Sequence, residues 1–167
     1  MKQTFRNRCT IATTAGTQIL TVPVEHTGGK AVNIRDVRIS GHGNWRHRHW
    51  NAISSAYGHS PFFQFYEDDL RPFFFEEKWE YLFDFNLDII HKMCELLDIK
   101  APSNLPPKGE ASEVSSPIDS LLPEASPFGG RLEGAYWQVF QQKHGFLPDL
   151  SILDLLCCMG NEAVLYL

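Results

Sequence analysis

The hydrophobic pattern changes its period near residue 44, and this change constrains the fold more than any other feature. Residues 3–12, QTFRNRCTIA, and residues 18–25, QILTVPVE, are rich in β-branched and aromatic residues and partly alternate. The segment TAGT, residues 14–17, separates them, so the three segments predict a β-hairpin. Residues 35–40 alternate in the same way and predict one more strand.

From there onward the apolar residues recur every three or four positions, which is typical of helices packed on a core. This spacing predicts a helix over residues 44–57 and a long amphipathic helix over residues 76–97. Between them, Pro61 opens an aromatic segment, and Pro72 predicts a break near Arg71 between two short helices.

The C-terminal third begins with a change of composition. Residues 101–130 are rich in Pro, Ser and Gly and predict a flexible loop or linker. Residues 135–146 can be helical or extended, and residues 150–159 predict a helix that starts near Ser151 and ends at Gly160. The expected fold is therefore an α/β domain, with a small N-terminal β-sheet packed against several α-helices and a Pro/Ser-rich loop before the C-terminal helix.

Composition narrows the class of protein. A chain of 167 residues suits a single domain, residues 1–167, with one core, and 43% hydrophobic residues indicate a globular protein. The net charge of −5 argues against a general nucleic-acid binder, which needs a basic face. The apolar runs fall short of the roughly 20 residues that span a bilayer.

Four cysteines without a CxxC motif suggest reduced thiols, so we expect a cytoplasmic protein. The glycine-rich phosphate-loop motifs are absent, and no cofactor is expected.

One histidine falls in the apolar stripe of the helix predicted over 44–57. With Asn44 as the cap, one side of this helix carries Trp45, His49, Ile53, Ala56 and Tyr57. His49 can be a hydrogen-bonded core histidine or a polar group that borders a pocket. In the second case its imidazole, with an unperturbed pKa of about 6.5, could act as acid or base. We expect it to be mostly buried.

A metal site formed by His42, His47 and His49 is not favoured. On a helix, His47 and His49 point roughly 200° apart, because each residue turns by about 100°. The sequence has no HExxH motif and no cysteine cluster to complete such a site, so we expect no structural metal.

Cations recur at even spacing near the N-terminus. On a strand, Lys2, Arg6 and Arg8 would share one face, and such a row can bind phosphate or carboxylate. The alternative is a solvated strand face. Asn7 would point to the opposite, buried face.

Two polar residues interrupt apolar helical stripes further along the chain. Asn86 must find partners if buried, and it either fastens two elements together or lines the same pocket as His49. Asp154 lies three residues after Ser151, and this spacing favours a capping role over a catalytic one. Cys157 and Cys158 look like core residues.

Six ordered segments resemble the WbqC-like protein family. They are KQTFRNRC, LTVPVE, GNWRHRHWNAISSAY, SPFFQFYEDDLRPFF, LFDFNLDIIHKMCELL and GFLPDLSILDLL, and they cover most of residues 2–167. The positions that look like the family's recurring ones are Asn7, Arg8, Trp45, His49, Ile53, Tyr57 and residues 151–154. Members of the family usually have a further strand-forming segment before the KQTFRNR match, which begins here at Lys2. We therefore expect a missing N-terminal segment.

The resemblance implies a role in bacterial O-antigen or surface-polysaccharide biosynthesis. The suggested activity is transfer of an aminoacyl group, such as glycine, or an acyl group to a sugar. His49 would be the catalytic acid or base, and the substrate-binding residues would be Arg6, Asn7, Arg8, Trp45, Tyr57 and Asn86. The alternative is a non-catalytic sugar- or protein-binding module that uses the aromatic residues of segment 62–75. Either way, the expected partner is a small-molecule or sugar ligand.

Overall fold

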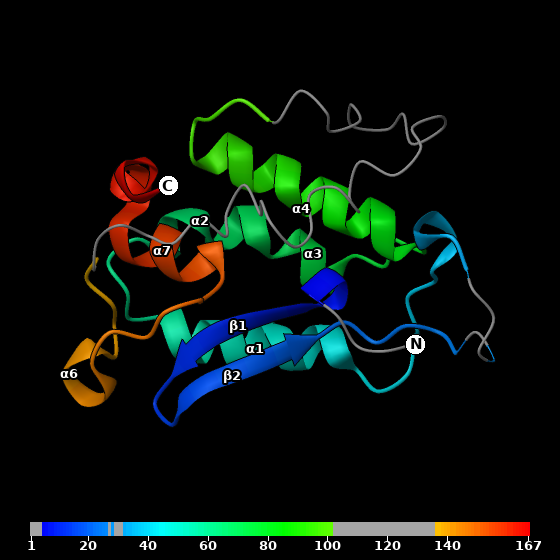
Figure 1. Ribbon diagram of the computed structural model, residues 1–167, viewed down its shortest axis with the longest axis horizontal. Coiled ribbons are helices and arrows are strands. Elements are labelled where there is room, and N and C mark those ends of the chain that lie inside the picture. The colour runs from blue at the N-terminus through cyan, green and yellow to red at the C-terminus, as the bar shows by residue number, and fades with distance from the viewer. Residues whose placement is uncertain (1–4, 27, 29–31, 102–135) are drawn as a thin grey trace.

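The N-terminal part of the computed structural model is a two-stranded hairpin (Figure 1). The structure describes residues 5–26, 28, 32–101 and 136–167. Strand β1, Arg8–Thr13, pairs antiparallel with β2, Gly16–Thr21, in a register that places Arg8 opposite Thr21. The predicted hairpin is confirmed, but Phe5–Asn7 form a 3-10 turn, η1, before the first strand.

The rest of the described chain is mainly helical. Its elements are η2 (Ile34–Asp36), α1 (Trp45–Tyr57), α2 (Phe63–Leu70), α3 (Pro72–Phe75), α4 (Leu82–Leu96), α6 (Gln141–His144), α7 (Ile152–Met159) and η3 (Gly160–Tyr166). The predicted helix boundaries at Asn44, Arg71, Ser151 and Gly160 are confirmed. Within the described ranges, no helix has both the length and the apolar character needed to cross a bilayer.

Two sequence predictions are wrong: part of the predicted strand forms the 3-10 turn η2, and the chain before Leu82 pairs with residues 37–39. Residues 35–40 do not form a regular strand, and the long helix starts at Leu82 instead of residue 76. The Ile39 N–H donates to Glu80 O at 2.8 Å, and the Leu82 N–H donates to Val37 O at 2.9 Å. These backbone bonds between distant segments hold the chain before Leu82 in an extended conformation. Sequence periodicity does not report such long-range pairing.

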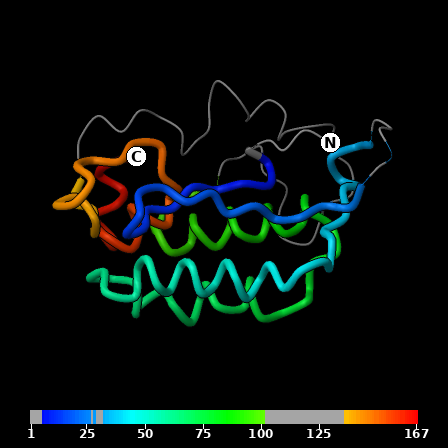
Figure 2. Tube along the Cα trace, turned by 90° about the horizontal axis from the view of Figure 1, so that it is seen from below, coloured from blue at the N-terminus to red at the C-terminus, as the bar shows by residue number. Residues whose placement is uncertain are grey.

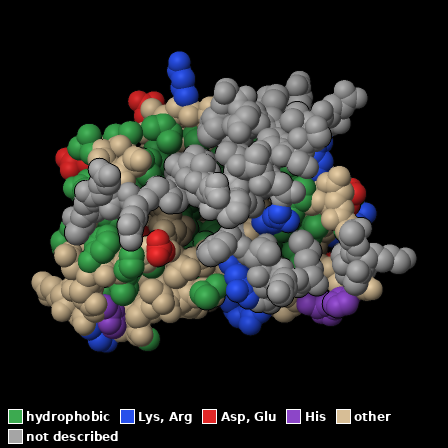
Figure 3. All heavy atoms as spheres, in the orientation of Figure 1, with side chains coloured by type: hydrophobic (Ala, Val, Ile, Leu, Met, Phe, Trp, Pro, Cys, Tyr) green, Lys and Arg blue, Asp and Glu red, His purple; other side chains and the backbone are tan. Residues whose placement is uncertain are grey.

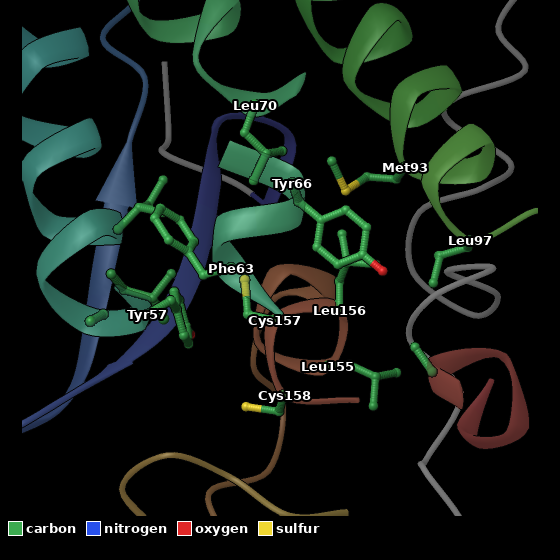
Figure 4. Close-up of a cluster of buried hydrophobic side chains, with 14 of the residues drawn as sticks. Tyr57, Phe63, Tyr66, Leu70, Met93, Leu97, Leu155, Leu156, Cys157 and Cys158 are labelled. Atoms are coloured by element: carbon green, nitrogen blue, oxygen red, sulfur yellow. The ribbon is translucent and has the colours of Figure 1, made fainter. Parts of the chain in front are cut away.

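The hairpin lies over α1, and the two views agree on this layering (Figures 1 and 2). β1 contacts both α1 and α7. The main core lies where these elements meet α2 and α4 (Figure 4). It includes Ile11, Leu20, Ile53, Tyr57, Phe63, Tyr66, Leu70, Met93, Leu97, Leu155, Leu156 and Cys157. The predicted α/β fold, with a small sheet packed against several helices, is confirmed.

A second buried cluster lies at the start of α1. It contains Val37, Ile39, Trp45, Phe73, Trp79, Leu82 and Phe85. The rings of Phe73 and Trp79 stack with centroids 4.9 Å apart. This cluster holds the first turn of α1 against α3 and α4, and so fixes the helix end on which the predicted site depends.

Candidate functional site

Six of the seven predicted site residues lie around the end of the hairpin where β1 begins. Asn86 of α4 donates from Nδ2 to Arg6 O at 2.8 Å. Asn7 is buried, as expected; its Nδ2 donates to Val22 O at 3.0 Å, and the Val22 N–H donates to Asn7 O at 2.8 Å. Both amides therefore fasten the 3-10 turn in place, which agrees with the fastening role considered for Asn86.

His49 reaches the same hairpin end from α1. Its ring meets Trp45 edge-to-face, with centroids 5.1 Å apart, and forms a hydrogen bond with the backbone of Thr21. Trp45 and Ile53 on the same stripe are 3% and 1% exposed, so the predicted phase of the helix is confirmed. His49 itself is half-buried, less covered than expected, and a pocket beside it stays a prediction.

The surroundings of His49 keep its imidazole neutral at pH 7. The pKa of His49 is lowered from 6.5 to about 4, mainly by burial and also by the Arg48 guanidinium, whereas the hydrogen bond to Thr21 acts in the opposite direction. The bond to Thr21 raises the pKa, so it is stronger when the ring is charged. This is expected when an imidazole N–H is the donor. The other ring nitrogen then carries a lone pair that can accept a proton or a hydrogen bond.

The two N-terminal arginines do not form the predicted row. Arg6 lies in the 3-10 turn, so the expectation that it shares a strand face with Arg8 is wrong. Arg8 alternates with Cys9, which packs with Ile11 on the core that includes α1. Strand alternation therefore starts the Arg8 side chain on the opposite face of the hairpin from α1. Lys2 lies outside the described residues.

Arg8 and His49 are nevertheless linked through Thr21. Thr21 is the register partner of Arg8, and its backbone bonds to His49. The two side chains thus lie on opposite faces of the hairpin, both next to Thr21. Figure 3 shows a group of Lys and Arg side chains in the part of this face where Figure 1 places the start of β1.

Tyr57 lies two helical turns away from His49 and belongs to a different cluster. Its hydroxyl accepts from the Ala12 N–H at 3.1 Å, and the side chain is fully buried beside Asp154. This contact pins the end of α1 to β1. Within the described structure, Tyr57 is part of the core and not of the hairpin end.

Asp154 is the polar residue whose surroundings the sequence did not reveal. Its carboxylate accepts from Tyr136 Oη at 2.6 Å, and Gln138 Nε2 donates to Tyr136 Oη at 3.1 Å. The predicted capping role is wrong, because the Ser151 hydroxyl caps α7 by accepting from the Leu153 N–H at 3.4 Å. Burial raises the pKa of Asp154, although hydrogen bonds from Tyr136 and Tyr57 lower it in part.

The histidines of the 42–49 segment do not converge. His42 and His47 are exposed, and His47 Nδ1 lies 3.1 Å from Asn51 Nδ2 on the outer face of α1. Across the residues that the structure covers, no three His, Cys, Asp or Glu side chains gather in the way a metal ion requires. The expected absence of a structural metal remains a prediction for elemental analysis.

Comparisons with known proteins assign the chain to a family. A model described as the WbqC-like protein family matches residues 1–117. An uncharacterized protein of Mycobacterium tuberculosis, Rv1507c, is 30% identical over 191 aligned residues, which cover 99% of this chain and 82% of the relative. No solved structure matches. The family match includes all seven predicted site residues, whereas Tyr136 and Asp154 lie beyond it.

Proposed function

The chain belongs to the WbqC-like protein family, and from this membership we propose that it is a transferase of bacterial surface-polysaccharide (O-antigen) biosynthesis. The transferred group is an aminoacyl group, such as glycine, or another acyl group, and the acceptor is a sugar. The four cysteines are all free thiols, which supports a cytoplasmic location.

His49 is the proton-transfer group in this proposal. A sugar amine or hydroxyl attacks the donor carbonyl, His49 takes the proton released by the attacking group, and then returns it to the leaving group. The observation that carries the proposal is its neutral, half-buried imidazole with one nitrogen held by Thr21. A pKa of about 4 gives a weak base, so an anionic donor bound nearby would raise the pKa and strengthen the base.

The remaining site residues contact or position the substrate. Arg6 and Arg8 bind the anionic part of the donor at the hairpin end, and Asn7 and Asn86 hold the turn that carries Arg6. Because Arg8 and His49 lie on opposite faces of the hairpin, one donor contacts both only if it passes around the hairpin end. Trp45 supports the His49 ring, and Tyr57 acts as a core residue that fixes α1.

The test first identifies ligands by a thermal-shift screen of nucleotide-sugars and acyl donors. Two variants are then compared with the wild-type protein in their affinity for these ligands and in turnover. His49→Gln should leave ligand affinity within about twofold and lower turnover by at least about 100-fold, the usual size of acid–base catalysis. Arg8→Gln should weaken binding instead. His47→Gln, an exposed histidine on the same helix, is the matched control and should change neither quantity. Undiminished turnover in His49→Gln would remove His49 from the mechanism.

A non-catalytic sugar- or protein-binding module is the second candidate. Two observations favour it: Arg8 and His49 lie on opposite faces of the hairpin, and Phe65 and Phe75 are 67% and 49% exposed. Phe63 and Phe73 of the same segment are buried, so only part of the predicted aromatic surface is available. This candidate is supported if Phe65→Ser weakens sugar binding and no donor is turned over by the wild-type protein.

A further inference from the structure

Two adjacent side chains at the start of α1 carry hydrogen-bond donors that have no acceptor. Trp45 is 3% exposed, and its indole Nε1 lacks a partner among the described residues. The same holds for Nε of Arg46, whose guanidinium lies over the Trp45 ring, 4.6 Å from its centroid. A buried N–H without an acceptor costs free energy, and such groups are rare in native proteins. Both donors therefore lack the acceptor that such buried groups usually have.

The backbone at the start of α1 also favours a negatively charged ligand. Asn44 precedes the helix with a positive φ of 31°, and within the described part of the chain its side chain makes no capping bond. The first turn, Trp45 to Arg48, contains two arginines and no acidic residue. The N–H groups of a first turn lack intrahelical acceptors and carry the positive end of the helix dipole.

We propose that the first turn of α1 binds an oxyanion, a phosphate or carboxylate group of a small ligand, between the Trp45 indole and the Arg46 guanidinium. Arg46 is half-buried, so solvent reaches part of its side chain. Bound there, the anion accepts hydrogen bonds from both orphaned donors and from the backbone of the turn. The inference rests on the proposed function and deepens it, because it places a second anionic contact of the donor, besides that of Arg6 and Arg8, on the same helix as His49.

The neighbours of this turn set its specificity. Glu77 lies near Arg46 and interacts with it electrostatically, so it competes with an incoming anion. Arg48 donates from Nη2 to Gly43 O at 2.7 Å and adds positive charge beside the turn. His49 contacts Trp45 directly, so an oxyanion held by the indole lies next to the proposed base.

The experiment follows the indole N–H resonances of the full chain by NMR while inorganic phosphate, pyrophosphate and acetate are titrated at constant ionic strength. The Trp45 resonance should move with saturation. The Trp79 resonance should not, because its Nε1 already donates to Asp88 at 2.8 Å. Stronger binding of pyrophosphate indicates a nucleotide phosphate, and stronger binding of acetate indicates an amino-acid carboxylate.

Matched variants separate this site from general charge effects. Arg46→Gln should weaken binding by at least about tenfold, as expected for loss of a charge-assisted contact. Glu77→Gln should strengthen it. Arg71→Gln removes another guanidinium stacked on a ring, 5.1 Å from Phe75, and should have no effect.

A Trp45 resonance that stays unchanged in the wild-type protein overturns the inference, whatever the variants do, and so does equal weakening by Arg46→Gln and Arg71→Gln. Because the readout is binding, it is independent of turnover. Oxyanion binding together with full turnover by His49→Gln would refute the proposed base alone.

Discussion

Asp154 carries a buried carboxyl group whose charge should make the protein's stability depend on pH. Burial raises its pKa above 3.8, so the folded state keeps the proton to a higher pH than the unfolded state. The stability from this group is full below the unfolded pKa and is lost as pH rises through the folded pKa. Relative to Asp154→Asn, the wild-type free energy of unfolding should fall with rising pH. Urea titrations at several pH values between about 4 and 8 measure this difference; a constant difference would contradict the prediction.

Tyr136 should contribute to stability through the same cluster. Tyr136→Phe removes the hydroxyl that donates to Asp154 and leaves a buried oxygen without that partner. We expect a loss of about 1–3 kcal/mol in the free energy of unfolding. The control is Tyr81→Phe, whose hydroxyl accepts from Arg38 near the surface, where changes of about 0.5 kcal/mol or less are usual. Equal losses in the two variants would contradict a special role for the Tyr136 bond.

The sequence predicted the position of His49 on its helix but not the contacts of Asp154, and the difference lies in the range of those contacts. The stripe that contains His49 depends on spacing within one helix. Asp154 depends on Tyr136 and Tyr57, which lie 18 and 97 positions away in the chain. An Asp within the apolar run SILDLLCC was the available signal, because a carboxyl group in such a run needs buried partners.

At the scale of elements, local signals located the helices and missed the pairing between segments. Gly58 ends α1 and Pro72 begins α3, as their backbone preferences require. The 37–39 and 80–82 segments pair through backbone groups, and neither segment alone shows this. The same limit explains Arg6, since the turn that removes it from β1 is held by Asn86 of α4.

Asn86 should therefore stabilise the junction between α4 and the start of the hairpin. Asn86→Ala removes the bond to Arg6 O and should lower the free energy of unfolding by about 1–2 kcal/mol, because the carbonyl is partly buried. Asn51→Ala, which removes an exposed amide on α1, should change it by less than about 0.5 kcal/mol. Hydrogen exchange should also show faster exchange of the Val22 N–H in Asn86→Ala. Unchanged exchange there would mean that the turn is held by other contacts.

At the scale of the whole molecule, the core should protect the cysteines. Cys94, Cys157 and Cys158 are buried, and burial raises the pKa of Cys158 to about 12 and that of Cys9 to about 11. Thiolates react and thiols do not, so the native protein should react slowly with a thiol-specific disulfide reagent at pH 8. All four should react quickly after unfolding in guanidinium chloride. Rapid reaction of the native chain would show that the core around these cysteines opens readily.

The packing around Asp154 also joins residues inside the family match to residues beyond it. Tyr57 lies within residues 1–117, whereas Asp154 and Tyr136 lie beyond them. Tyr57 and Asp154 are buried side by side, so the two parts share one cluster, and the single-domain organisation stays a prediction.

We infer that His49 is a neutral base beside an oxyanion site, and NMR titration of its imidazole is the decisive experiment. The His49 signals are assigned by their loss in His49→Gln. In the free protein the ring should titrate with a pKa of about 4. With saturating phosphate or acetate the pKa should rise, because the anion and the proton each favour binding of the other. A pKa near 6.5 that is the same with and without the oxyanion would contradict the account.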